Sequence, residues 1–144
     1  MIGIDVGGAN LKVVDGRKVD IRYCPLFAGA PLADMLQNYA RAEGVDAAAV
    51  VMSGELADCF GSRMEGVSFI VRAVRAAIPG AIFYGTDARF HREAVPQLAA
   101  ANWLASADYL RERYPHGILV DMGSTTTDIV PLSRFPELLG LTDL

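Results

Sequence analysis

The sequence has little of several residue types that mark particular classes of protein. Its 144 residues include two cysteines, one tryptophan and two histidines, and no segment is a run of lysine or arginine. Cys24 and Cys59 lack a Cys-x-x-Cys spacing, and His91 and His116 are isolated, which excludes a disulfide scaffold and a structural zinc site. Thirteen basic against seventeen acidic residues give a net charge of −4. That balance argues against nucleic acid or an anionic membrane as a partner.

Long hydrophobic runs are also missing. The apolar start of the chain reaches Asp5 too early for a signal peptide or a membrane span. We therefore expect a cytoplasmic protein with reduced cysteines. Hydrophobic residues make up 52% of the chain, and the mean hydropathy is +0.28. This length and composition predict roughly one domain with a real core.

The spacing of the apolar residues predicts an α/β chain. Runs of β-branched and other apolar residues predict strands at 2–6, 11–14, 19–23, 47–52, 81–84, 118–122 and 129–132. Helical spacing and its Gly and Pro boundaries predict helices at 31–43, around 67–74 and at 96–114. The first three strands should be antiparallel, and the continuous apolar run at 47–52 should be covered on both faces.

One motif occurs twice, near the two ends of the chain. Residues 5–12 (DVGGANLK) and residues 121–128 (DMGSTTTD) share a layout. Each has an aspartate at the end of a strand, then small residues, then a polar residue before a second strand. Neither copy is a Walker loop, because no Gly-Lys-Ser/Thr follows, and neither is a Rossmann fingerprint, because the next element is a strand.

These two turns predict a site for a phosphorylated small molecule. Glycines let the backbone approach a phosphate closely, so that several N–H groups can converge on it. The predicted phosphate-binding residues are Gly7, Gly8, Asn10, Lys12, Gly123, Ser124, Thr125 and Thr126. Asp5 and Asp121 are predicted to hold a hydrated Mg²⁺ between them, and so to be catalytic. The alternative is plain turn chemistry, with each aspartate capping its own turn.

Other acidic residues follow the buried strands. Glu55 and Asp58 come after the strand at 47–52, where ligands gather in α/β sheets, and are predicted to be catalytic. The alternative is that they are acids favoured by the start of a helix. Asp87 follows the next predicted strand and is a weaker candidate for the same role. Asp128 is expected either to orient the second turn or to act in catalysis. Cys59 is expected to be a buried inert thiol, and neither histidine is expected to have a partner.

These motifs resemble those of the acetate and sugar kinase, Hsp70 and actin superfamily. Residues 121–128 are similar to its hydantoinase/oxoprolinase branch. Residues 51–60 and 100–105 look like the methanofuran-biosynthesis members of that branch, often labelled tetrahydromethanopterin-linked one-carbon transfer proteins. The resemblance implies a ribonuclease-H-like lobe of the actin and sugar-kinase type at 1–115, with antiparallel hairpins, parallel strands and helices. Residues 116–144 would then begin a second lobe that is truncated.

The resemblance also implies a reaction. Methanofuran-pathway members are transferases that join an aminomethylfuran pyrophosphate to a tyramine-type acceptor, with Mg²⁺ and without ATP, and release pyrophosphate. The alternatives are an ATP-dependent hydantoinase/oxoprolinase-like hydrolase or small-molecule kinase, and an inactive nucleotide-binding fragment. Two departures from the superfamily are Ala9, where many members have threonine, and the early end of the chain. An exposed sheet edge would favour a homodimer.

Overall fold

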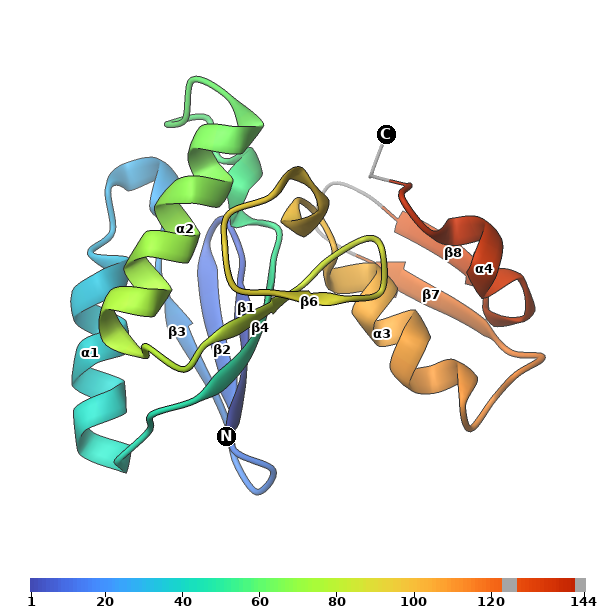
Figure 1. Cartoon of the computed structure of the whole chain (residues 1–144), viewed down its shortest axis with the longest axis horizontal. Helices are drawn as coiled ribbons and strands as arrows, with labels where there is room; N and C mark the ends of the chain where they lie inside the picture. The colour runs from blue at the N-terminus through green and yellow to red at the C-terminus, as the bar shows by residue number, and fades with distance from the viewer. Residues whose placement is uncertain (123–126, 142–144) are drawn as a thin grey trace.

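The computed structural model describes residues 1–122 and 127–141. Two long helices, α1 and α2, cover one face of the main β-sheet (Figure 1). The helix α3 lies on the other side of that sheet, and the hairpin β7–β8 and the short helix α4 follow it. The chain is thus α/β with both parallel and antiparallel strands, as the sequence predicts.

The main sheet has six strands in the order β3-β2-β1-β4-β5-β6. The strands are β1 (Ile2–Val6), β2 (Asn10–Val14), β3 (Val19–Tyr23), β4 (Ala48–Met52), β5 (Ile82–Tyr84) and β6 (Phe90–His91). Strands β1, β4 and β5 run parallel, whereas β2, β3 and β6 are antiparallel to their neighbours. The segments that follow the three parallel strands therefore emerge at one edge of the sheet.

Helices α1 (Leu32–Glu43) and α2 (Arg63–Ala77) form where apolar residues recur at helical spacing. The left-handed Gly44, with φ of 65°, ends α1. Ser62 begins α2, and its side chain accepts a hydrogen bond from the Glu65 amide at 3.2 Å. Together the two helices pack against the sheet and bury the main core. This core includes Leu36, Ile70 and Phe83.

The prediction of a single helix at 96–114 is wrong, because a non-helical segment interrupts this region. A 3₁₀ turn, Pro96–Leu98, is followed by a buried linker, and α3 then covers only Asn102–Arg111. Ala100 in the linker has a φ of 50°, which a helix cannot contain. The Gln97 carbonyl accepts a hydrogen bond from the Thr86 amide at 2.7 Å, which ties the 3₁₀ turn to the end of β5.

The second copy of the motif forms a hairpin, as expected. Strands β7 (Ile118–Met122) and β8 (Thr127–Pro131) pair antiparallel in a separate two-stranded sheet. Leu104 on α3, Val130 on β8 and Phe135 on α4 (Phe135–Leu138) share a second buried cluster. Beyond α4, the Gly140 amide donates to the Thr86 carbonyl at 2.7 Å. This cluster joins the hairpin to α3. The predicted boundary between two lobes at residues 115 and 116 stays a prediction.

The face of the sheet turned toward α3 is covered only in part. Along β4, Ala48, Val50 and Met52 are buried, whereas Ala49 and Val51, which point to the α3 side, are half-buried. The expectation that the strand is fully covered on both faces is therefore wrong for the α3 face. One narrow helix spans fewer strands than the paired helices α1 and α2 do on the opposite face.

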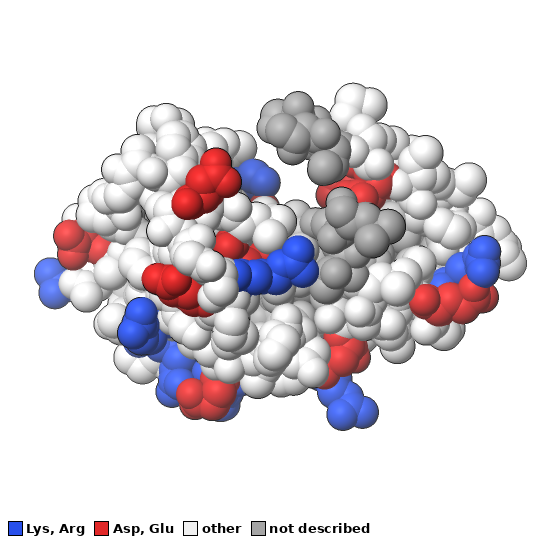
Figure 2. Space-filling model, turned by 90° about the horizontal axis from the view of Figure 1, so that it is seen from above, with Lys and Arg blue, Asp and Glu red and all other residues white. Residues whose placement is uncertain are grey.

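The described part of the surface mixes charges of both signs. Figure 2 shows lysine and arginine beside aspartate and glutamate over the face seen from above, without a continuous field of one sign among the described residues. Across residues 1–122 and 127–141, every helix is too short or too polar to cross a bilayer.

Candidate functional site

The turn between β1 and β2 is held by its carbonyl groups. The Gly8 carbonyl accepts a hydrogen bond from the Leu26 amide at 2.9 Å, and the Ala9 carbonyl accepts one from the Cys24 amide at 2.8 Å. Within the described residues, the amides of Gly8 and Ala9 donate to no acceptor. The turn at 7–9 therefore uses its oxygens to fix its shape and leaves two N–H groups available to an anion.

The segment after β4 packs directly against this turn. A Cβ built on Gly54 would lie 2.9 Å from the Gly7 carbonyl oxygen and 2.8 Å from Cδ1 of Leu26. The position of Gly54 thus requires glycine, because the two backbones touch. A Cβ on Gly8 would meet nothing within 4 Å. The turn is backed by the 3₁₀ helix Gly54–Leu56 on one side and is open at Gly8.

Asp5 and Lys12 face each other across β1 and β2 and form an ion pair. The Lys12 Nζ lies 2.7 Å from Oδ2 of Asp5, and the two side chains are 50% and 21% exposed. The other carboxylate oxygen of Asp5, Oδ1, is buried and accepts no hydrogen bond from the described residues. The duplicated motif therefore places a lysine and a carboxylate with one spare oxygen beside the glycine turn.

The second hairpin repeats the register of the first with different chemistry. Asp121 faces Asp128 across β7 and β8, as Asp5 faces Lys12 across β1 and β2. The two predicted metal-binding aspartates, Asp5 and Asp121, lie on different sheets. The predicted phosphate-binding residues that lie outside the described residues are Gly123, Ser124, Thr125 and Thr126.

Glu55 and Asp58 occupy different environments, although only two residues separate them. Glu55 is 1% exposed and lies in the 3₁₀ helix that backs the first turn, where Gly66 of α2 packs against its backbone. Asp58 is exposed in the following turn. Cys59 is exposed as well, and its Sγ lies 3.3 Å from the Leu26 carbonyl oxygen. The expectation of a buried thiol there is wrong, because the apolar run does not continue into this turn.

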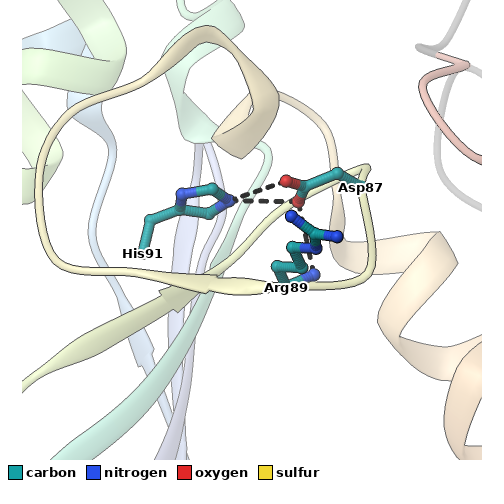
Figure 3. Close-up of polar contacts among 3 residues, drawn as sticks. All are labelled: Asp87, Arg89 and His91. Carbon is teal, nitrogen blue, oxygen red and sulfur yellow. Dashed lines mark hydrogen bonds and ion pairs between the residues drawn. The ribbon is translucent and has the colours of Figure 1, made fainter.

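Asp87 and His91 form a pair that the sequence analysis missed. The imidazole Nε2 of His91, on β6, lies 3.0 Å and 3.1 Å from the two carboxylate oxygens of Asp87, which lies in the turn between β5 and β6 (Figure 3). Burial raises the pKa of Asp87, but the hydrogen bond from His91, its charge and the Arg89 amide together hold that pKa below its ordinary value. The expectation that neither histidine has a partner is wrong for His91, and the Asp-x-x-x-His spacing was the available signal.

A groove of about 740 Å³ lies between α3 and the open face of the sheet. Its lining includes Asp5 and Lys12 on the sheet and Tyr84 at the end of β5. The Tyr84 hydroxyl donates to Oδ2 of Asp108 on α3 at 2.7 Å. Burial and this hydrogen bond raise the pKa of Tyr84 well above its ordinary value. The ion pair beside the glycine turn thus also faces this groove.

Comparison with known proteins identifies relatives of the chain. The family model described as Hydantoinase/oxoprolinase matches residues 46–137. The whole chain aligns over 156 residues, at 36% identity, with the (4-{4-[2-(gamma-L-glutamylamino)ethyl]phenoxymethyl}furan-2-yl)methanamine synthase of Methanocaldococcus jannaschii. The chain spans about half of that relative, 47% of its length.

Proposed function

The chain belongs to the hydantoinase/oxoprolinase family, and from that premise we propose that it acts in the synthesis of a methanofuran-type cofactor. In this proposal it is a transferase that joins an aminomethylfuran pyrophosphate to a tyramine-type acceptor and releases pyrophosphate. The similarity along the whole chain to a synthase named for a phenoxymethyl-furan methanamine supports this assignment.

The glycine turn is the observation that carries the proposal. Its amides at Gly8 and Ala9 have no acceptor among the described residues, and the Asp5–Lys12 pair lies on the strands that it joins. Donors that are fixed before the reaction stabilise charge that develops on a leaving group without having to reorganise. A pyrophosphate bound at this turn would place that charge close to two N–H groups and to the cationic side chain of Lys12.

A single carboxylate oxygen of Asp5 supports the proposal of a magnesium ion at this turn. Magnesium prefers oxygen ligands and is held by one or two carboxylates, with water and phosphate oxygens completing its shell. Oδ1 of Asp5 is such an oxygen, because it is buried and accepts no hydrogen bond from the described residues. We assign Asp5 and Asp121 as the carboxylates that would hold the ion. When bound, it would neutralise charge on the pyrophosphate.

The acceptor must lose a proton as it reacts. Its oxygen forms a bond to the furfuryl carbon, the bond from that carbon to the pyrophosphate oxygen breaks, and the electron pair leaves with pyrophosphate. The proton passes to a carboxylate. Asp58 is exposed to solvent at the edge where β4 ends, and Glu55 is buried behind the turn. Asp58 is therefore our first choice for the proton acceptor, and Glu55 is the second.

The products of the reaction test this function directly. The full chain is incubated with the furan pyrophosphate, the acceptor and Mg²⁺, and separately with ATP, while pyrophosphate, phosphate and ADP are measured. We expect pyrophosphate release that does not depend on ATP. Release of ADP or phosphate from ATP would instead support a hydrolase or kinase of the wider superfamily. Absence of product in both arms would contradict an enzymatic role for this chain.

Two substitutions connect the activity to the turn. Gly8→Ala adds a Cβ into open space, so the fold should tolerate it, while the methyl group would obstruct a phosphate that approaches the turn. Asp5→Asn keeps the shape of the side chain but removes its charge. We expect each to lower pyrophosphate release by about tenfold or more, in line with the loss of one oriented group. Asp20→Asn on β3, whose carboxylate pairs with exposed Arg22, is the matched control and should change nothing.

A further inference from the structure

We propose that two copies of this chain associate, with the outer face of the β7–β8 hairpin of one copy seated on the bare part of the main sheet of the other. Two apolar faces that lie open in the described structure carry the inference. It goes beyond the proposed function, and the association can be measured without any substrate.

The first surface, which we call the β3 face, is the part of the open side of the main sheet that α3 leaves exposed. It consists of four apolar residues on β2 and β3, each between 40% and 71% exposed: Val14, Val19, Ile21 and Tyr23. Val19 lies opposite Val14, and Ile21 lies opposite Lys12, so the four side chains share one face of the sheet. A contiguous apolar patch of this kind is typical of a contact surface.

The pattern of β3 is the reverse of that in a strand that packs on its own core. Asp20 and Arg22 lie on the side of α1, where the guanidinium of Arg22 is 5.4 Å from the centre of the Tyr39 ring. The apolar residues of β3 point the other way, into solvent. Because side chains alternate between the two faces of a strand, a shift of one residue in register would exchange the two sets. The observed register therefore keeps the β3 face on the outside.

The second surface, which we call the hairpin face, is the outer side of β7 and β8. It consists of four apolar residues, each between 54% and 75% exposed: Ile118, Val120, Met122 and Ile129. The other side of the hairpin packs through Val130 into the cluster with α3 and α4. Antiparallel strands with one face in water normally carry polar residues on that face, and a two-stranded sheet is marginally stable by itself. Covering the hairpin face would remove apolar surface from water and support the hairpin.

The charges of the two surfaces favour contact between unlike faces. Residues 10–23, which include β2 and β3, carry four basic and two acidic side chains. Residues 117–131, which include β7 and β8, carry two aspartates and neither lysine nor arginine. Surfaces of opposite net charge attract each other, whereas surfaces of the same net charge repel. A second copy would therefore bring its hairpin face to the β3 face, and the chain itself supplies the complementary partner.

Within one chain, the two faces do not cover each other. Figure 1 shows the β7–β8 hairpin beyond α3, on the other side of that helix from β2 and β3. Tyr23 and Met122 thus stay exposed, and tyrosine and methionine are among the residue types enriched where proteins meet. Val14 and Val19 also line the groove beside α3, so the hairpin of the second copy would border that groove.

Sedimentation of the full chain tests the association. Equilibrium runs from micromolar to near-millimolar concentration, at low ionic strength, follow the mass of the particle. We expect a reversible increase from the monomer to the dimer. A monomer throughout this range would leave both faces for another occupant, such as a polypeptide like the part of the relative that this chain does not match, and would overturn the inference.

Two charged substitutions test which faces meet. Ile21→Lys places a cation in the β3 face, and Val120→Glu places an anion in the hairpin face. Each alone should weaken the association about tenfold or more, because it sets a charge within an apolar contact. An equal mixture of the two variants should restore much of it, because each variant keeps the intact face that the other needs. A loss caused by misfolding would not be restored by mixing.

Contact between like faces gives a different result. If the β3 face pairs with itself, Val120→Glu has no effect on the association. If the hairpin face pairs with itself, Ile21→Lys has none. Either result, or a mixture of the two variants that stays monomeric, would overturn the inference.

Matched substitutions on the opposite side of the sheet are the controls. Ala76→Lys on α2 and Asn38→Glu on α1 introduce the same charges at exposed positions, and both should leave the mass distribution unchanged. Methyl NMR spectra of the parent chain locate the contact. On dilution, the signals of Ile21 and Val120 should shift, while that of Ile70 in the main core should stay in place. Shifts confined to other surfaces would overturn the inference.

Discussion

Replacing Gly54 by alanine should destabilise the fold at the turn that we assign to phosphate. The added methyl group would lie 2.9 Å from the Gly7 carbonyl oxygen, 3.0 Å from its carbonyl carbon and 2.8 Å from Cδ1 of Leu26. Two of these contacts are with backbone, so they cannot be relieved by a change of rotamer. Overpacking of this kind costs about 1–3 kcal/mol, which we expect as the loss in free energy of unfolding.

Urea unfolding followed by circular dichroism measures this loss. With a slope of about 2 kcal/mol per molar urea, a loss of ~2 kcal/mol lowers the midpoint by roughly 1 M. Gly8→Ala is the matched control, because its methyl group meets nothing within 4 Å and Gly8 has no positive φ. Its free energy of unfolding should stay within about 0.5 kcal/mol of that of the parent chain or rise slightly. Equal midpoints for the parent chain and Gly54→Ala would refute the close packing of these two backbones.

Two further substitutions test other parts of the fold. Leu104→Ala should cost about 2–5 kcal/mol, because Leu104 is fully buried between α3 and the β7–β8 hairpin; a loss below ~1 kcal/mol in urea would contradict that packing. Asp87→Asn tests the pair with His91 through acid unfolding. The pKa of Asp87 is lowered from 3.8, so its carboxylate stabilises the fold above about pH 4, and this contribution is lost as the pH falls through the folded value. The variant should therefore lose less stability than the parent chain below pH 4, and an identical acid dependence would show that the pair is not formed.

Local sequence patterns were enough to predict the two hairpins and the other strands of the described residues except β6 (Phe90–His91), which the sequence analysis missed. The seven-residue spacing from Asp5 to Lys12 and from Asp121 to Asp128 returns as direct cross-strand pairing in both hairpins. A short turn between two apolar runs fixes the register, so this information is contained in the sequence itself. The prediction of a helix at 96–114 is wrong at Ala100, which has a left-handed backbone. An alanine gives no reason to expect that conformation, because glycine is the residue that usually adopts it.

The groove could not be predicted from any local pattern. It exists because α3 returns across the sheet after the buried linker and covers only part of its open face. Asp5 was selected for its place before a glycine turn, whereas its contact with Lys12 depends on the pairing of β1 with β2. The spacing of Asp87 and His91 is visible in the sequence. Their hydrogen bond, however, depends on the turn between β5 and β6, which brings the two side chains together.

The two matched hairpins differ in what they need from their surroundings. The first carries its own counter-ion, since the cation of Lys12 neutralises Asp5 in the adjacent strand. The second sets two anions, Asp121 and Asp128, side by side, and like charges at such positions repel. Pairing of β7 with β8 should therefore strengthen with ionic strength and with added divalent cations, whereas pairing of β1 with β2 should weaken slightly in salt. The first hairpin therefore balances its own charges, whereas the stability of the second hairpin depends on the ions in the surrounding solution.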